Sequence, residues 1–340
     1  MMKPSFSAAS SSKVLKIIYD YEMSSCAYVA ARLNIAELLY EKPRHVTELA
    51  QLTGTNATAL YRVLRVLAGE GLFSESAPQV FSYLPAAAAL HGETTGSVKY
   101  FLQAILGEFR YAFGNLLYSV RTGETGFDHH YGKEIWEYYQ EHPEEALNFN
   151  KSMAGLTQYY SPAVISGYDF SQFRTIVDIG GGNGALLFNV LHAFPTVKGV
   201  IFDVPSVVEQ AEQLIAENGL QERCSATSGD FFKAVPPGGD AYMMKYILHD
   251  WNDEQSVTIL RNCAAVMEKG AKVVVLDSVI PAGDEWHPGK HMDATMLACT
   301  KGRERNEDEF RHIFTEAGLK FNKVVKLEID EISIVEGEKV

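Results

Sequence analysis

The chain has 340 residues, a formal net charge of −13 at pH 7, and 46% hydrophobic against 21% charged residues. This length is enough to bury a large core and to form two domains. The negative charge argues against a nucleic-acid or anionic-membrane partner, and no apolar run reaches the roughly 20 residues of a membrane-spanning helix.

The four cysteines show neither pairing nor metal-ligand spacing, which is typical of a reduced, intracellular protein. They are Cys26, Cys224, Cys263 and Cys299. The segment 1–12 is rich in Ser and Ala and lacks the basic-then-apolar order of a signal peptide, so we expect a mobile tail. A cytoplasmic location follows as an expectation.

The N-terminal part predicts a small, mainly helical domain. Apolar residues recur at helical spacing in three segments: 13–39, 48–52 and 56–69. Thr47 is a candidate N-cap for the second segment, and Asn56 starts the third. Two β-rich runs, 72–73 and 80–84, flank a turn at Pro78 and predict a hairpin. Helix–turn–helix followed by a hairpin is a winged-helix arrangement.

A winged helix has two uses that the sequence must separate, DNA binding and structural dimerisation. Residues 1–90 contain eight Lys/Arg against seven Asp/Glu, and the candidate recognition helix offers only Arg62 and Arg65. DNA readers normally present a clustered basic face. We therefore expect residues 1–92 to form a structural, dimerising domain that binds no nucleic acid.

The middle segment, 93–160, is helical in pattern and unusually rich in aromatic residues. Most aromatic side chains are core residues, but this density ahead of a cofactor domain predicts that some line a pocket for a flat, apolar substrate. The pair His129-His130 is expected on a loop, where adjacent side chains diverge, so we assign it no ligand role.

The C-terminal half, 161–340, alternates strand and helix patterns. Strands are expected at 174–179, 199–203, 224–228, 240–247, 271–278, 321–327 and 332–336. Helices are expected at 184–194, 206–218, 253–268 and 307–317. This alternation predicts an α/β fold with a doubly wound, mainly parallel seven-stranded sheet, whose ligands bind at the carboxyl ends of the strands.

The segment 177–185 (Val-Asp-Ile-Gly-Gly-Gly-Asn-Gly-Ala) joins a strand to a helix through glycines, a nucleotide-binding pattern. Gly180, Gly182 and the later Asp203 also satisfy the dinucleotide fingerprint. Asp178, however, would repel a pyrophosphate and suits a cationic ligand. S-adenosylmethionine carries a sulfonium and an ammonium but no phosphate, so this segment favours it as the cofactor.

Further polar residues recur at the expected strand ends. Asp203 can accept hydrogen bonds from both ribose hydroxyls, Asp230 can accept one from the adenine amino group, and Phe231 can stack on the ring. Taken singly, each of the two acids has an alternative as a turn or cap residue. Their joint recurrence favours a cofactor site.

His249 follows a strand of apolar residues and is the candidate general base, since a histidine pKa of about 6.5 suits that task. The alternative is a loop histidine that closes the turn. The nearby acids have a structural explanation, because Asn252 or Asp253 is expected to cap the following helix. We therefore do not assign a catalytic role to Asp250 or Asp253.

His287 and His291, with Asp293 nearby, have a spacing that could bind zinc on a helix. Pro288 and Gly289 make a helix there unexpected, and we predict no metal site.

These residues together resemble the class I, S-adenosylmethionine-dependent small-molecule O-methyltransferases of the caffeic acid, acetylserotonin and bacterial polyketide/phenazine type. The resemblance covers nearly the whole chain. It is carried by Trp136, 149–153 (Phe-Asn-Lys-Ser-Met), 177–182 (Val-Asp-Ile-Gly-Gly-Gly), 202–205 (Phe-Asp-Val-Pro), 229–232 (Gly-Asp-Phe-Phe), 245–251 (Lys-x3-His-Asp-Trp) and 302–305 (Gly-Arg-Glu-Arg).

The resemblance implies a homodimer formed through the N-terminal domain, an aromatic small-molecule substrate and roles for particular residues. Cofactor contacts are implied for Gly180, Asp203, Asp230, Phe231 and Lys245. His249 matches the general base, flanked by Asp277 and Glu304. The family often has Glu at the first of these acids, so the reach of the shorter Asp277 is in doubt.

Substrate contacts are implied for Phe149 and Met153, and we add Trp251 and Met296 to this set. Three alternatives stay open: a non-methylating reaction with the same cofactor, such as hydroxylation, decarboxylation or pericyclic chemistry; a ligand-sensing DNA-binding regulator; and a nicotinamide oxidoreductase. The substrate itself does not follow from the resemblance.

Overall fold

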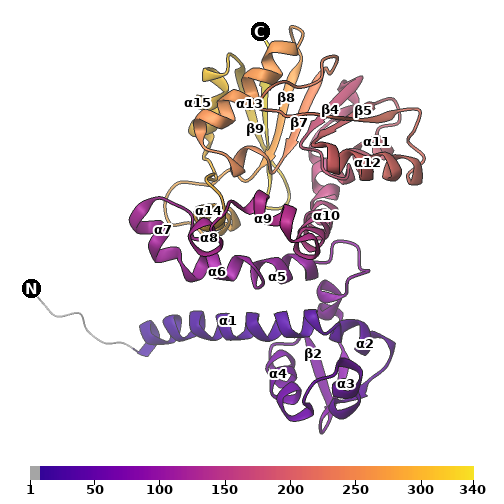
Figure 1. Cartoon of the computed structure of the whole chain (residues 1–340), viewed down its shortest axis with the longest axis vertical. Coiled ribbons are helices and arrows are strands. Elements are labelled where there is room, and N and C mark those ends of the chain that lie inside the picture. The colour runs from indigo at the N-terminus through magenta and orange to yellow at the C-terminus, as the bar shows by residue number, and fades with distance from the viewer. Residues whose placement is uncertain (1–7) are drawn as a thin grey trace, which may run out of the picture. The chain divides into compact units, whose positions relative to one another are not determined.

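The computed structural model describes residues 8–340, which form two compact units (Figure 1). The first unit consists of the chain up to Arg110 and the later segment Pro143–Leu156. The second unit consists of Tyr111–His142 and Thr157–Val340. The division into domains 1–92, 93–160 and 161–340 stays a prediction. Within the described part of the chain, no helix is both long and apolar enough to cross a membrane.

The first unit contains the expected winged helix. Its elements are α1 (Ala8–Arg32), α2 (Ile35–Glu41), β1 (Arg44–His45), α3 (Val46–Thr53), α4 (Ala57–Gly69), β2 (Phe73–Ala77), β3 (Val80–Tyr83), the 3₁₀ helix η1 (Pro85–Leu90) and α5 (Lys99–Ile105). The predicted hairpin is β2–β3, and β1 adds to it in the order β1-β3-β2. Ile35, Leu64, Phe73 and Phe81 are fully buried in its core.

Three details of this unit differ from the expectation. Residues 8–12 of the expected mobile tail belong to α1, and the rest of that tail lies outside the described residues. The segment 13–39 is not one helix, because Asn34 takes a left-handed conformation (φ 54°) between α1 and α2. Helix α3 begins at Val46 and is capped by the His45 ring, which accepts a hydrogen bond from the Thr47 N–H. Thr47 is therefore inside the helix. Asn56 caps α4 as predicted, accepting from the Ala59 N–H.

The second unit is built on a seven-stranded sheet in the order β6-β5-β4-β7-β8-β10-β9. The strands are β4 (Thr175–Ile179), β5 (Lys198–Asp203), β6 (Cys224–Ser228), β7 (Ala241–Lys245), β8 (Lys272–Asp277), β9 (Lys320–Lys326) and β10 (Ser333–Glu338). The first five pair in parallel, and β10 is antiparallel to both its neighbours. This confirms the predicted, mainly parallel sheet. The strand order reverses between β4 and β7, where ligands bind in such sheets.

Helices cover both faces of this sheet. On one face, α13 (Asp253–Val266) and α15 (Glu307–Glu316) share a buried apolar cluster with the sheet, including Val177 and Ile179. On the other face, Leu187 of α11 (Ala185–Ala193) packs against Gly199, and α12 (Pro205–Glu217) follows β5. Because side chains alternate along a strand, Asp178 points to the face opposite Val177.

The remaining helices are α6 (Phe109–Gly114), α7 (Leu116–Thr122), α8 (Gly126–Tyr131), α9 (Ile135–Glu141), α10 (Pro143–Gly167), the 3₁₀ helices η2 (Phe170–Gln172) and η3 (Leu248–Asp250), and α14 (Pro288–Cys299). Two of them correct the sequence analysis. His129 and His130 lie in α8, not on a loop, and stack on Tyr118 and Tyr111.

The second correction concerns the histidine pair at 287 and 291, where a helix was not expected. Helix α14 starts at Pro288. Proline has no backbone N–H, but at the first position of a helix that N–H would have no intrahelical acceptor, so nothing is lost there. His287 is its N-cap, with the ring accepting a hydrogen bond from the Gly289 N–H at 3.1 Å. The imidazole of His287 thus has a structural use.

Candidate active site

The turn after β4 exposes backbone at the carboxyl end of the sheet. Gly180, Gly182 and Gly184 have φ of 65°, 56° and 81°, a region that favours glycine. A Cβ on Gly180 would lie 2.4 Å from Ile247 Cδ1, whereas one on Gly182 would meet nothing within 4 Å. The backbone at Gly182 is therefore open to a ligand, as the sequence pattern predicted.

Asp203 lies at the end of β5, directly beside this turn. Its Oδ2 accepts a hydrogen bond from the Gly182 N–H at 2.8 Å, and its Oδ1 accepts one from the Val204 N–H at 2.7 Å. A carboxylate offers about four lone-pair sites, so each oxygen retains capacity for a further donor. This arrangement suits a group with two adjacent hydroxyls, such as a ribose.

Asp178 and Lys245 provide opposite charges in the interior next to the turn. Burial raises the pKa of Asp178 to about 7, and the Lys245 ammonium acts in the opposite direction. Burial likewise lowers the pKa of Lys245 to about 8, although neighbouring carboxylates, Asp178 first among them, counteract it. A buried acid and a buried base at one edge of a sheet fit a ligand that carries both an ammonium and a carboxylate.

Asp230 and Phe231 follow β6 and lie near an aromatic cluster. The Asp230 Oδ1 accepts from the Phe232 N–H at 2.9 Å, and the residue lines a cavity of about 290 Å³ together with Phe202 and Gly229. The Trp251 ring packs edge-on against Phe232, with centroids 4.7 Å apart, and lies 6.1 Å from Phe231. The structure thus groups Trp251, expected at the substrate, with the predicted cofactor residues.

His249 lies in η3, immediately after β7, and is buried. Its Nδ1 is 2.7 Å from Glu304 Oε1, and its Nε2 is 3.6 Å from Asp250 Oδ1. The ring stacks on Tyr246, whose backbone has a positive φ of 54°. An ionised Glu304 would accept a hydrogen bond from Nδ1–H, which keeps the ring proton on Nδ1. The lone pair of Nε2 then stays available to a substrate hydroxyl, as a general base requires.

The two predicted flanking acids differ in what they contact. Glu304 reaches the imidazole, whereas neither buried oxygen of Asp277 hydrogen-bonds to a side chain among the described residues. The backbone of Tyr246 interacts with the Asp277 carboxyl and lowers its pKa. Burial raises the pKa of Asp277 to about 7 and that of Glu304 to about 8. Asp277, the shorter of the two acids, makes no hydrogen bond to His249.

Sequence reasoning missed Asp250. It was set aside because the acids near His249 have a capping role, but the cap is Asn252, in a capping box with Gln255. Burial raises the pKa of Asp250 to about 6, and its carboxylate faces Nε2 of His249. Its position directly after the histidine was the available signal.

The substrate residues expected from the sequence are distributed over both units. Phe149 and Met153 lie in α10, in the part that belongs to the first unit, where the Phe149 ring packs on Phe109. Met296 is buried in α14, three residues after Asp293, whose carboxylate accepts the Glu304 N–H at 2.9 Å. The substrate roles of these residues stay predictions.

Comparison with known proteins matches both parts of the chain. Residues 113–320 match the O-methyltransferase domain and residues 15–93 the O-methyltransferase dimerisation domain. The chain belongs to the O-methyltransferase family. It is 40% identical to the phenazine O-methyltransferase PhzM of Lysobacter antibioticus, over 97% of this chain and 96% of that protein.

Solved structures agree with this assignment. The crystal structure of LaPhzM has a TM-score of 0.93 at 38% identity and covers 97% of this chain and 99% of that one. The O-methyltransferase NcsB1, in complex with S-adenosyl-L-homocysteine and 1,4-dihydroxy-2-naphthoic acid, has a TM-score of 0.80 at 30% identity, with 93% and 96% covered. This protein is an O-methyltransferase whose cofactor is S-adenosylmethionine.

Proposed function

We propose that this enzyme methylates a phenolic hydroxyl of an aromatic secondary metabolite, with His249 as the general base. The observation that carries the proposal is the buried contact of 2.7 Å between His249 Nδ1 and Glu304 Oε1. It fixes one ring nitrogen on a carboxylate and directs the other away from it. A relative named as a phenazine O-methyltransferase, and a solved relative in complex with 1,4-dihydroxy-2-naphthoic acid, support the aromatic class of substrate.

The residues around the glycine turn fit the cofactor. Asp203 would hold the ribose hydroxyls, Asp230 the adenine amino group, and Gly180 and Gly182 let the ligand approach the backbone. Asp178 and Lys245 would face the ammonium and carboxylate of the methionine part. When bound, S-adenosylmethionine supplies a methyl group already activated by its sulfonium.

What this chain has to supply is proton removal and alignment. A phenol has a pKa of about 10 and an ordinary histidine one of about 6.5, so complete proton transfer before methylation would cost about 5 kcal/mol. His249 therefore takes the proton as the new C–O bond forms. The Glu304 carboxylate stabilises the imidazolium that results, because it accepts the Nδ1–H.

The direct test is His249→Gln, with the exposed His192→Gln on α11 as the matched control. We expect His249→Gln to bind S-adenosylmethionine normally and to lose at least about a hundredfold in kcat, a typical general-base contribution. The control should keep both. Unchanged turnover in His249→Gln would remove this residue from the reaction.

The substrate class is tested with a panel of aromatic acceptors, including a hydroxyphenazine and 1,4-dihydroxy-2-naphthoic acid, incubated with the enzyme and S-adenosylmethionine. Mass spectrometry should show a gain of one methyl group on oxygen, matched by release of S-adenosylhomocysteine. A product altered in any other way, without that gain, would favour non-methylating chemistry and contradict the proposal.

A further inference from the structure

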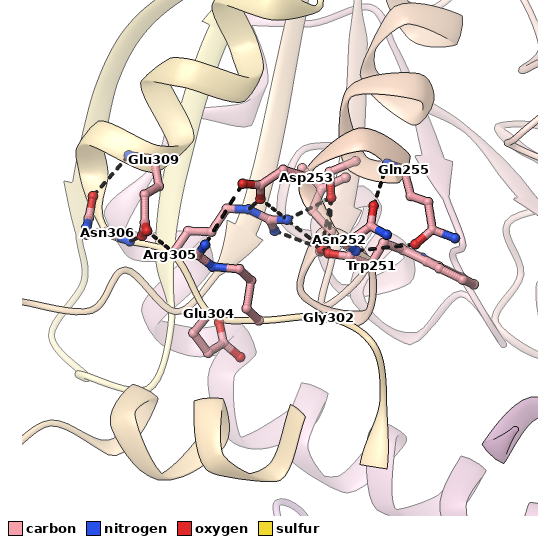
Figure 2. A network of polar contacts seen from close by, with 12 residues as sticks. Trp251, Asn252, Asp253, Gln255, Gly302, Glu304, Arg305, Asn306 and Glu309 are labelled. Carbon is pink, nitrogen blue, oxygen red and sulfur yellow. Dashed lines mark hydrogen bonds and ion pairs between the residues drawn. The ribbon is translucent and has the colours of Figure 1, made fainter. Parts of the chain in front are cut away.

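Arg305 is fully buried, and its guanidinium contacts the turn that carries His249 (Figure 2). Its Nη1 donates to the Leu248 carbonyl and its Nη2 to the Trp251 carbonyl, both at 2.9 Å. These two carbonyls flank residues 249 and 250 on either side. The guanidinium therefore spans the η3 turn from its first residue to the residue that follows it.

The guanidinium is itself held in place. Its Nε donates to Asp253 Oδ1 at 2.9 Å, and its Nη2 also donates to Ser256 Oγ at 3.0 Å. Both partners lie in the first turn of α13. An arginine offers five donors in a rigid, planar fork, which suits bonds in several directions from one buried point. A lysine at this position could not span both carbonyls.

The segment 302–305 is also in direct contact with the same turn. A Cβ on Gly302 would lie 1.9 Å from the His249 carbonyl oxygen, so only glycine fits there. At the other end, the Arg305 carbonyl accepts the Ile280 N–H at 3.0 Å, which fixes the segment to the chain leaving β8. Glu304, the partner of His249, lies between these two anchor points.

We propose that Arg305 is a positioning residue for His249: it holds the η3 turn against the Glu304 segment, so that the imidazole and its carboxylate partner move as one unit. This inference rests on the proposed role of His249 as the base. Catalysis requires the base within hydrogen-bond reach of the hydroxyl, and a displacement of about 1 Å can cost about a hundredfold in rate.

The charge of Arg305 acts in the same direction as its hydrogen bonds. It opposes the effect of burial on Glu304 and Asp277, whose pKa values it lowers. Three carboxyl groups also act on the imidazole: Glu304 contacts Nδ1, Asp250 lies near Nε2, and Asp277 interacts with the ring electrostatically. Arg305 therefore favours the ionised Glu304 that keeps the proton of the neutral imidazole on Nδ1.

The experiment compares Arg305→Gln and Arg305→Lys with Arg303→Gln, an exposed arginine of the same segment that is paired with Glu309. The full-length protein is labelled with ¹⁵N-histidine and saturated with S-adenosylhomocysteine. Long-range ¹H–¹⁵N spectra then report the ring tautomer of His249, identified by the signal lost in His249→Gln.

At pH 9, where Glu304 with its pKa of about 8 is mainly ionised, we expect wild type and Arg303→Gln to show one neutral tautomer with the proton on Nδ1. Arg305→Gln should show a mixture of tautomers and a kcat at least about tenfold lower, with the Kd for S-adenosylmethionine within about twofold of wild type. The tautomer ratio and kcat of Arg305→Lys should lie between those of wild type and Arg305→Gln, because lysine keeps the positive charge but not both carbonyl contacts. An unchanged His249 signal and kcat in a folded Arg305→Gln would overturn the proposal.

A second variant covers the case in which Arg305→Gln does not fold. Asp253→Asn, at a partner about 41% exposed, weakens the ion pair that orients the guanidinium. It also weakens the 4.0 Å contact of Asp253 with Arg303, which the Arg303→Gln control removes by itself. It should shift the His249 signal in the same direction by a smaller amount, and no shift would refute the inference. If the wild-type enzyme methylates none of the aromatic acceptors but Arg305→Gln still changes the His249 signal, the proposed function is refuted and the positioning role of Arg305 is not.

Discussion

The buried Glu304 carboxyl lies 2.7 Å from Nδ1 of His249, so its ionisation decides whether it can accept a hydrogen bond from the ring. Burial raises the pKa of Glu304 to about 8, while the base function needs this carboxylate ionised and Nε2 unprotonated. We therefore expect kcat/KM to rise with pH, to bend near pH 8 and to level off at about pH 9. A pH–rate profile from pH 6 to 9 measures this limb, and a flat profile would contradict it.

We expect Asp178 to make both the stability of the protein and cofactor binding depend on pH. Its pKa is raised by burial from 3.8 to about 7, so the folded chain binds more protons than the unfolded chain between these values. Stability of the unliganded protein therefore falls as pH rises through this window.

A cationic ligand prefers the ionised carboxylate, so the Kd for S-adenosylmethionine should decrease severalfold from pH 6 to pH 8, measured by isothermal titration calorimetry. Asp178→Asn should bind more weakly at pH 8 and lose most of the pH dependence. A variant that keeps the wild-type slope would show that another group is responsible.

At the scale of the elements, the spacing of apolar residues predicted the strands and several of the helices of the second unit. Period-two and period-3.6 patterns placed the seven strands of the second unit and four of its helices, α11, α12, α13 and α15, because each element buries one face or stripe. The same strand assignments placed the glycine turn and the acidic residues at the carboxyl ends of the strands. The helix break at Asn34 and the helix start at Pro288 were not predicted, because a left-handed residue between helices and a proline at a first helical position leave little trace in hydrophobic periodicity.

The contacts around His249 were less predictable, because they join segments about fifty residues apart. The sequence indicated His249 and, through family resemblance, Glu304, and the structure joins them. It did not indicate that Arg305 bridges the carbonyls of Leu248 and Trp251. Such contacts are set by tertiary packing, which no pattern within one segment reports.

The capping box of α13 gives a prediction about one element. Asn252 Oδ1 accepts from the Gln255 N–H at 2.9 Å, and the Gln255 side chain accepts from the Asn252 N–H. Asn252→Ala should lower the free energy of unfolding by about 1 kcal/mol, whereas Asn252→Ser should retain most of it. Chemical denaturation of both variants measures the difference, and equal losses would mean that the cap bond contributes little.

On the scale of the whole molecule, α1 carries an apolar stripe that one chain leaves exposed. Val14, Ile17 and Tyr21 follow helical spacing, and their exposed fractions are 59%, 68% and 66%. A stripe of this kind on a domain that matches an O-methyltransferase dimerisation domain supports a homodimer in which α1 is covered. In a twofold-symmetric interface each residue occurs twice.

Ile17→Glu should therefore dissociate the dimer. Burying an isoleucine contributes about 1.5–3 kcal/mol, and two copies are lost together with the desolvation of two carboxylates, so the dimer Kd should rise at least about a hundredfold. Lys16→Ala, on the same helix but with a side chain about 75% exposed and paired with Asp20, is the matched control and should stay dimeric. Light scattering after size exclusion, over a concentration series, distinguishes the two. A monomeric wild type, or a dimeric Ile17→Glu, would show that this stripe is not the interface.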